Sequence, residues 1–212
     1  MGLFFISASG QDEVRGAFPE RRKGGSNPEV TVEVFIDLQC PSCATFFTSE
    51  LLTGIERRFG QRVAVIYRNW PLMQIHRDAF LAACAVEAAG LQGKFWEMIQ
   101  VLLGRQSEWV RRRNLRKRDV LPMSMLDPKP EYNAMVVERF VLYAKDLGLD
   151  ADMFRDDLKG NFVKNRVTAD VRRATELRIY STPTVIVNGE ILSFEDHQNL
   201  PDFIERKLKK QR

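Results

Sequence analysis

At 212 residues the chain is long enough for one large domain or two small ones with a substantial buried core. Its 44% hydrophobic and 28% charged residues are typical of a globular protein, and no apolar run approaches the ~18 residues of a membrane span. Three cysteines are too few for a disulfide scaffold, and two histidines disfavour a multi-ligand metal site. The net charge of +4 comes from residues 111–118, which carry six positive charges, so no nucleic-acid partner is expected.

The first 28 residues are predicted to be a flexible leader. Residues 3–8 are apolar but much shorter than the core of a signal peptide, and Ile6-Ser7-Ala8 resembles the small-residue end of such a signal. Residues 10–27 are polar and include Gly24 and Gly25. Two interpretations are open: the remnant of a secretion signal, or a frayed tail.

A strand, a helix and a second strand are expected next, with the folded part beginning at Val30. Residues 31–38 are rich in β-branched and apolar side chains, which fits a strand buried on both faces. Cys40-Pro41-Ser42-Cys43 follows, then a helix to about Arg58 and a short strand at residues 63–67. A strand–helix–strand segment of this length predicts a right-handed parallel βαβ unit.

A block of helices is predicted after Trp70-Pro71. Most of these helices end next to a glycine, which is common just beyond a helix C-terminus. They are expected at residues 78–89, 94–103, 131–147, a short stretch capped by Asp150, and residues 162–177. Residues 105–130 are polar and contain three prolines, so an extended connection is expected there.

The last part of the chain returns to a strand pattern. Residues 184–187 and 190–194 flank Asn188-Gly189, which is the strongest short signal for a β-hairpin. A final amphipathic helix is expected from about Leu200 to Leu208.

The cysteine pair is the most informative feature of the chain. Pro41 suits a first helical turn, which places Cys40 at a helix N-terminus, where unpaired N–H groups favour thiolate over thiol. Cys43 lies one turn further along and is expected to be covered by the helix. The pattern therefore predicts an attacking Cys40 and a resolving Cys43. The alternatives are half of a zinc site, for which no second CxxC, CxxH or HxxxH exists, and a plain structural pair.

The chain resembles the DsbA-like thiol-disulfide oxidoreductases of the thioredoxin superfamily. Residues 34–43 look like the active-site strand and turn of that family, and Pro71-Leu72, His76 and residues 92–98 look like its helical insertion. Thr182-Pro183-Thr184 with Val187-Asn188-Gly189 is similar to its cis-proline loop and hairpin. The resemblance covers about residues 28–209.

The resemblance implies roles for the residues around the pair. Cys40 is expected to be the nucleophile, Cys43 the resolving thiol, and Pro183 a cis-proline packed against the disulfide. The backbone of Thr182, exposed beside the sulfurs, is expected to pair with an extended substrate segment like an added strand. Pro41 and Ser42, between the cysteines, complete the expected substrate-binding residues.

One position departs from the family pattern. Six residues before the first cysteine the family commonly has a buried acid that moves protons to and from the second cysteine, and this chain has Val34 there. Glu33 and Asp37 are nearby, but strand alternation puts them on the opposite face from Val34. Water or Asp37 is then expected to carry the proton.

Four further features have less specific signals. Cys84 is expected to be a small buried packing residue. His76 is expected to be structural, for example as a cap of the following helix, rather than catalytic. The aromatic residues of 95–98 are expected in the core. The basic segment 111–118 is interpreted as a solvated face, with attraction of acidic substrates or lipid headgroups as the alternative.

These observations predict an α/β protein with a thioredoxin fold and an inserted all-helical domain. Residues 29–70 and 179–212 are expected to form the thioredoxin-like domain, residues 71–178 the inserted helical domain, and residues 1–28 the leader. The expected function is a thiol-disulfide oxidoreductase that forms or exchanges disulfides in protein or peptide thiol substrates through a mixed disulfide. No metal or organic cofactor is needed, because the disulfide is itself the redox group.

The expected partners are the thiol substrates and an unidentified redox protein that reoxidises the cysteine pair. The protein is expected to be a monomer without stable membrane insertion. Its expected location is outside the cytoplasm, in the periplasm or cell envelope. Rival functions are a disulfide isomerase or reductase, a glutathione-using isomerase and a non-catalytic binding module. About 28 leader residues cannot form the N-terminal dimerisation domain of isomerases of this type, which favours an oxidase.

Overall fold

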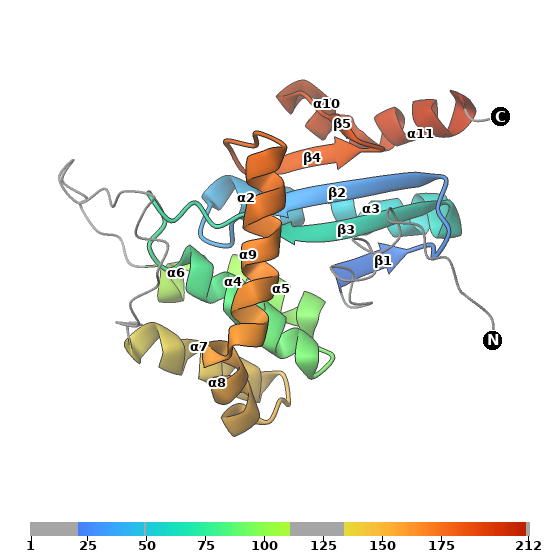
Figure 1. Cartoon of the computed structure of the whole chain (residues 1–212). Helices are drawn as coiled ribbons and strands as arrows, with labels where there is room; N and C mark the ends of the chain where they lie inside the picture. Colours follow the sequence, from blue (N-terminus) through green and yellow to red (C-terminus); the bar gives the residue numbers. More distant parts are fainter. Residues whose placement is uncertain (1–20, 49, 111–133, 211–212) are drawn as a thin grey trace, which may run out of the picture.

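The structure is a computed structural model that describes residues 21–48, 50–110 and 134–210 (Figure 1). Its centre is a five-stranded sheet in the order β1-β3-β2-β4-β5. The strands are β1 (Arg22–Gly24), β2 (Val30–Ile36), β3 (Val63–Asn69), β4 (Thr184–Val187) and β5 (Glu190–Ile191). Only β2 and β3 pair in parallel, and the other neighbours are antiparallel.

The βαβ unit expected from the sequence is confirmed. Val30 to Ile36 of β2 lie in register with Val63 to Asn69 of β3. The connection consists of helices α2 (Pro41–Thr48) and α3 (Glu50–Phe59), followed by a short 3-10 helix, η2 (Gly60–Arg62). Gly60 has a positive φ of 55°, which is the left-handed conformation that lets the chain leave α3 and turn back toward the sheet.

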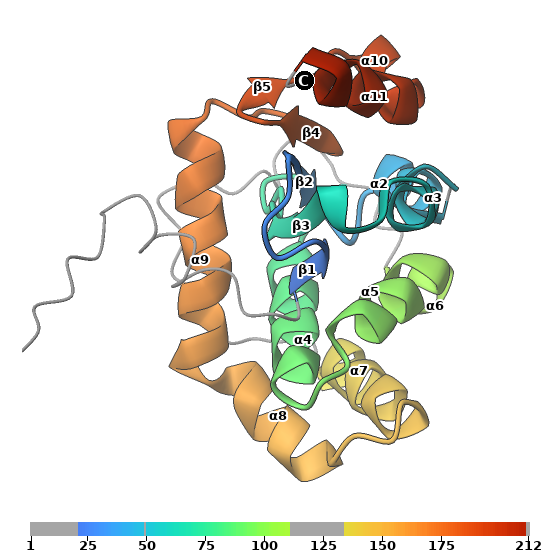
Figure 2. The same ribbon diagram turned by 90° about the vertical axis from the view of Figure 1, so that its right-hand side faces the viewer.

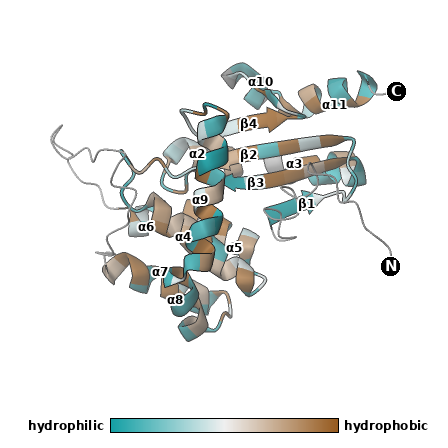
Figure 3. Ribbon diagram, viewed as in Figure 1, coloured by the Kyte–Doolittle hydropathy of each residue, from teal (hydrophilic) through white to brown (hydrophobic). Residues whose placement is uncertain are grey.

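Each face of the sheet is covered by its own hydrophobic cluster, because successive side chains of a strand point to opposite faces. Phe35 and Ile186 pack on one face with Ala174 of α9 and with Ile179, which follows that helix. The opposite face carries the main cluster, to which Val34 of β2 contributes together with α2 and α3. Figure 2 shows these layers, with α9 on one side of the sheet and α2 and α3 on the other. Figure 3 shows that β2, β3 and β4 are largely hydrophobic, as two-sided burial requires.

A block of helices is inserted between β3 and β4, as expected. Its members are α4 (Ala79–Leu91), α5 (Phe95–Gly104), α6 (Gln106–Trp109), α7 (Ala134–Asp146), α8 (Ala151–Lys159) and α9 (Asn161–Glu176). Asp150 caps α8 by accepting from the backbone N–H of Asp152 and Met153, at 3.0 and 2.9 Å. Val163 and Val167 of α9 are fully buried.

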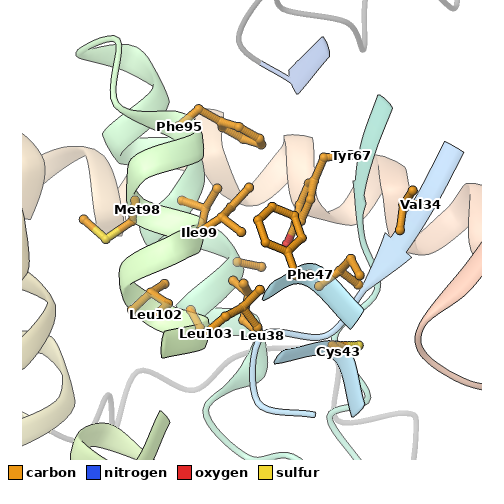
Figure 4. Packing of buried hydrophobic residues seen from close by; sticks show 14 of the residues in the cluster. Val34, Leu38, Cys43, Phe47, Tyr67, Phe95, Met98, Ile99, Leu102 and Leu103 are labelled. Atoms are coloured by element: carbon orange, nitrogen blue, oxygen red, sulfur yellow. The ribbon is translucent and has the colours of Figure 1, made fainter. Parts of the chain in front are cut away.

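Helix α4 lies at the centre of this block and is buried on nearly all sides, which matches its uniformly apolar composition. Its small alanines let α5, α8 and α9 pack closely around it. Figure 4 shows Tyr67 of β3 and Phe47 of α2 facing the side chains of α5, which joins the core of the insertion to that of the sheet. The rings of Tyr67 and Phe95 meet edge to face at 5.4 Å.

Two expectations about the helical block are corrected: where its first helix ends, and where the extended connection begins. Gly90 does not end its helix but lies inside α4, where a Cβ atom would come within 3.0 Å of the Phe95 ring, so the position needs a glycine for close packing. The left-handed residue is Gly93, with φ of 75°. Residues 106–109 form α6 instead of an extended connection, because buried Trp109 anchors them through a hydrogen bond from its Nε1 to the Leu102 carbonyl. The basic segment 111–118 lies outside the described residues.

The prediction that residues 1–28 form a flexible leader is wrong for residues 21–24. Residues 22–24 form edge strand β1, antiparallel to β3, and Arg21 is fully buried. Gly24 has a φ of 92° and lies so close to the Val63 carbonyl that no side chain fits there. The polar composition suggested a solvated tail, but the buried guanidinium is compensated by carboxylates from distant parts of the chain.

The carboxyl-terminal part follows the sequence prediction. Asn188 and Gly189 have φ values of 48° and 83°, the left-handed pair that a tight hairpin between β4 and β5 requires. The hairpin is followed by α10 (Phe194–Gln198) and α11 (Leu200–Lys210), which buries Phe203 and Leu208 on its apolar side. No helix in the described ranges has both the length and the apolar character to cross a membrane.

Candidate active site

The two cysteines lie where β2 ends and α2 begins. Pro41 is the first residue of α2, a position at which its missing N–H removes no helical hydrogen bond. The Cys40 carbonyl accepts hydrogen bonds from the backbone N–H of Cys43 at 3.1 Å and of Ala44 at 3.3 Å. Cys40 is therefore the residue at the N-terminus of α2, as the sequence predicts, and Cys43 lies one turn into the helix.

The two sulfurs have opposite acid strengths. Both thiols are free and buried, with exposed fractions of 8% for Cys40 and 0% for Cys43. A hydrogen bond from the Cys43 thiol, opposed by burial, is the main effect that lowers the pKa of Cys40 to about 5, and Thr182 and nearby backbone N–H groups add to it. Burial, with the hydrogen bond and charge of Cys40, raises the pKa of Cys43. One thiol is set up as a nucleophile and leaving group at neutral pH, and its partner stays protonated.

The loop before β4 closes the site from a distant part of the chain. The Thr182–Pro183 peptide bond is cis. The Thr182 carbonyl oxygen accepts from the Cys40 thiol at an Sγ–O distance of 3.6 Å. Thr184 stabilises the loop by donating from its hydroxyl to the Ser181 carbonyl at 2.8 Å. The structure thus brings Cys40, Cys43 and Thr182 into one site, as the family resemblance implies, with Pro183 next to Thr182 in the chain.

The acid expected in the family behind the cysteines is absent at its usual position. Val34 occupies that position and is fully buried in the apolar core. Asp37 lies behind the cysteine turn instead, and His76, expected to cap a helix, bonds to it with an Nδ1–Oδ2 distance of 2.8 Å. Pro41 and Ser42 are exposed on the outer side of the turn, where a substrate can reach them.

Gln106 of α6 is a site residue that the sequence did not indicate. Its Nε2 donates to the carbonyls of Leu38 at 2.7 Å and Cys40 at 3.1 Å. One amide group from the helical insertion therefore holds both ends of the turn that carries the nucleophile. No sequence motif marks it, because the contact joins residues more than sixty positions apart.

Replacing Gln106 by leucine should slow alkylation of Cys40 at pH 5 by about two- to threefold, because the released carbonyl dipoles disfavour the nearby thiolate. The measurement is the iodoacetamide rate of reduced protein, read at Cys40 by mass spectrometry. Gln92→Leu is the matched control, since Gln92 makes the same kind of clamp on the backbone of Asp150 within the insertion. Equal rates in the Gln106 and Gln92 variants would show that Gln106 only supports the fold.

The remaining sequence candidates lie away from the sulfurs. Cys84 is buried inside α4, and burial raises the pKa of its thiol to about 12, which is consistent with a packing residue. Phe95 and Met98 are core residues, as expected. Within the described part of the chain no three histidine, cysteine or acidic side chains gather as a metal site would require.

Comparison with known proteins places this site in a family. The family described as Thioredoxin, Thioredoxin_4, matches residues 19–206, so the chain belongs to it. The oxidised BdbD of Bacillus subtilis is similar in structure, with a TM-score of 0.68 at 22% identity over 89% of this chain and 92% of BdbD. The thiol-disulfide exchange protein alpha-DsbA2 of Wolbachia pipientis has a TM-score of 0.65 at 15% identity, covering 93% of this chain and 92% of its own. The DsbA-like thioredoxin fold with a helical insertion is thereby confirmed.

Curated relatives at higher identity are much longer proteins. The Na(+)/H(+) antiporter NhaA 1 of Salinispora arenicola is 34% identical over 169 residues, which are 79% of this chain but 21% of the antiporter. The chain therefore spans about a fifth of the length of this relative. The ion exchange named in its description belongs to the whole protein and is not assigned to this chain.

Proposed function

We propose that the chain is a protein thiol-disulfide oxidoreductase that oxidises cysteine pairs in protein or peptide substrates. The observation that carries the proposal is the contrast between the two neighbouring sulfurs. Cys40 has a pKa lowered to about 5, and Cys43 is fully buried with a raised pKa. Such an asymmetric pair at a helix N-terminus suits disulfide exchange, whereas a merely structural pair needs no such difference between its sulfurs.

The reaction begins from the oxidised Cys40–Cys43 disulfide. A substrate thiolate attacks Cys40 Sγ, which forms a mixed disulfide, and Cys43 leaves and takes up a proton because its pKa is raised. A second substrate thiolate then attacks the substrate sulfur of the mixed disulfide. Cys40 leaves as a stable thiolate because its pKa is low. The substrate dithiol has become a disulfide, and the two electrons reside on the enzyme pair.

Two features around the cysteines support these steps. The Thr182 carbonyl lies 3.6 Å from Cys40 Sγ, which supports our proposal that an extended substrate pairs with the Thr182 backbone beside the sulfurs. The apolar Val34 offers no proton, so by our proposal the proton for Cys43 comes from water or through Asp37. A separate redox protein, by our proposal also outside the cytoplasm, accepts the electrons and restores the disulfide.

The function is tested by dithiothreitol-dependent reduction of insulin. Cys40→Ser should lower the rate at least a hundredfold, whereas Cys84→Ala, which removes the third thiol inside α4, should stay within about twofold of the parent chain. Equal rates for the parent chain, Cys40→Ser and dithiothreitol alone would favour a non-catalytic binding module. The reduction potential against glutathione then separates an oxidase from an isomerase or reductase, because a more oxidising disulfide favours substrate oxidation.

A further inference from the structure

A carboxylate is buried directly behind the turn that carries Cys40. The Asp37 side chain has an exposed fraction of 0%. Its Oδ1 accepts from the backbone N–H of Gln39 at 2.7 Å, and its Oδ2 accepts from that of Leu72 at 2.8 Å. The carbonyl of Asp37 also accepts from the backbone N–H of Cys40 at 3.1 Å. Both carboxyl oxygens therefore accept hydrogen bonds from backbone N–H donors.

His76 is the ionisable side chain that contacts this carboxylate. Its Nδ1 lies 2.8 Å from Asp37 Oδ2, and 19% of its side chain is exposed. The hydrogen bond with Asp37, opposed by burial, is the main effect that raises the pKa of His76, and the charges of Asp37 and Cys40 raise it further. The imidazolium form is thus favoured where a proton can still exchange with water.

Among the described residues, the further titratable groups that interact with this pair are two thiols and a phenol. Cys40, directly before α2, and Cys43 inside it interact with the pair, and Tyr67 does so from β3, where burial raises the pKa of the phenol and the charge of Asp37 adds to that effect. Asp78, two residues beyond His76, is tied through its backbone N–H to Gln39 Oε1 at 2.9 Å. The charge balance behind the turn is therefore set by Asp37 and His76. An unbalanced Asp37 carboxylate would oppose ionisation of Cys40, since like charges at short range disfavour each other.

We propose that His76 is a positioning residue for the reaction of Cys40: its imidazolium neutralises the buried Asp37 carboxylate behind the turn and so favours the Cys40 thiolate. The proposal rests on the proposed function, in which Cys40 is the nucleophile. It gives His76 an electrostatic role in place of the helix cap expected from the sequence. It also explains why a buried acid is tolerated next to a thiolate.

Coupling between two titrating groups is reciprocal, which provides a test on the unaltered protein. If the imidazolium favours the thiolate, the thiolate must hold the His76 proton more tightly. The chain has two histidines, so the ring protons of His76 are assigned by comparison with His197→Gln. NMR titration should give a higher pKa for His76 in the reduced protein than in the oxidised protein. Identical titration curves in both redox states would overturn the proposal.

Variants then separate charge from structure. His76→Gln retains an N–H donor for Asp37 but no charge, and should slow alkylation of Cys40 at pH 5 by about three- to tenfold. Asp37→Asn combined with His76→Gln restores a neutral pair and should return the rate toward that of the parent. His197→Gln is the matched control, because it removes the other histidine from α10, and it should leave the rate unchanged.

The outcomes distinguish this proposal from the proposed function. A slow double variant, or no effect of His76→Gln, would show that His76 does not act by neutralising Asp37, while fast alkylation of Cys40 in the parent would still support the oxidoreductase. Slow alkylation of Cys40 in the parent, with the pH dependence of a free thiol, would instead contradict the oxidoreductase itself. The NMR comparison needs no substitution, so a failure of the double variant to fold leaves the test intact.

Discussion

Reduced protein should react with iodoacetamide at Cys40, with a rate that rises through a midpoint near pH 5 and is level above pH 6. At pH 6 a thiol with a pKa of about 5 is almost fully ionised, whereas a free thiol is ionised to roughly 0.3%. The less basic thiolate is about 40-fold less nucleophilic, so Cys40 should react roughly tenfold faster than a free thiol. Cys43 and Cys84 should stay unlabelled, because burial raises the pKa of both. Preferential labelling of Cys43 would reverse the assigned roles.

The same asymmetry fixes the pH dependence of the reduction potential. Between pH 6 and pH 8 reduction takes up one proton, on Cys43, while Cys40 remains a thiolate, so the potential should fall by about 30 mV per pH unit. Below pH 4 both sulfurs take protons and the slope should double to about 59 mV. The thiolate stabilises the reduced fold fully above pH ~8.5, and this contribution is lost as the pH falls through about 5. A glutathione titration at five pH values measures the slope, and 59 mV per unit between pH 6 and pH 8 would contradict a low Cys40 pKa.

Local patterns were sufficient to predict most of the fold. The β-branched run at residues 31–38, the glycine after α7 and the Asn188-Gly189 turn depend on interactions within a few residues, so the sequence displays them directly. Cys40 and Cys43 were predicted for the same reason, because a helix N-terminus and a spacing of two intervening residues define their chemistry locally.

Long-range polar contacts could not be predicted in this way. Gln106 reaches the Cys40 carbonyl across 66 positions, and Arg21 meets Asp170 across 149. Neither residue has a neighbour in sequence that signals its partner, and both types are most often exposed. Glu87 is similar, since a single acid within an alanine-rich helix suggests a solvent-facing position, whereas its exposed fraction is 1%. For such polar residues, the sequence suggests an exposed position, and only the structure reveals their burial and their partners.

Arg21→Ala should destabilise the protein by about 3–5 kcal/mol, which corresponds to a fall in melting temperature on the order of 10 °C for a chain of this size. The Arg21 side chain is 1% exposed and bonds to Glu87 and, at 3.0 Å, to Asp170. These carboxylates belong to α4 and α9, and Asn69 at the end of β3 donates to both, at 2.8 and 3.3 Å. One guanidinium therefore joins the first described residue to the sheet and to two helices.

Alanine at position 21 leaves two buried carboxylates with less compensation, and this is the source of the large expected effect. Arg166 still pairs with Glu87 at 2.6 Å, so the fold should be weakened but not lost. Arg155→Ala is the matched control, because Arg155 pairs with the exposed Glu138 and its removal should change the melting temperature little. Cys40 alkylation in the folded Arg21 variant should match that of the parent, since this cluster shares no residue with the cysteine turn.

The loss caused by Arg21→Ala should also depend on pH. Burial raises the pKa of Glu87, and Arg21 and Arg166 oppose that effect, so removing Arg21 raises the pKa further. A carboxyl group whose pKa is higher in the folded than in the unfolded chain destabilises the fold at high pH, and the penalty disappears as the pH falls through the folded pKa toward ~4.3. The difference in melting temperature between parent and variant should therefore be larger at pH 8 than at pH 5. Adding Glu87→Gln should recover part of the loss at pH 8, because it removes the uncompensated charge while keeping an acceptor for Asn69. A parent-like melting temperature of Arg21→Ala at both pH values would mean that the guanidinium is not in the core, and residues 21–24 would then be the solvated leader that their composition suggests.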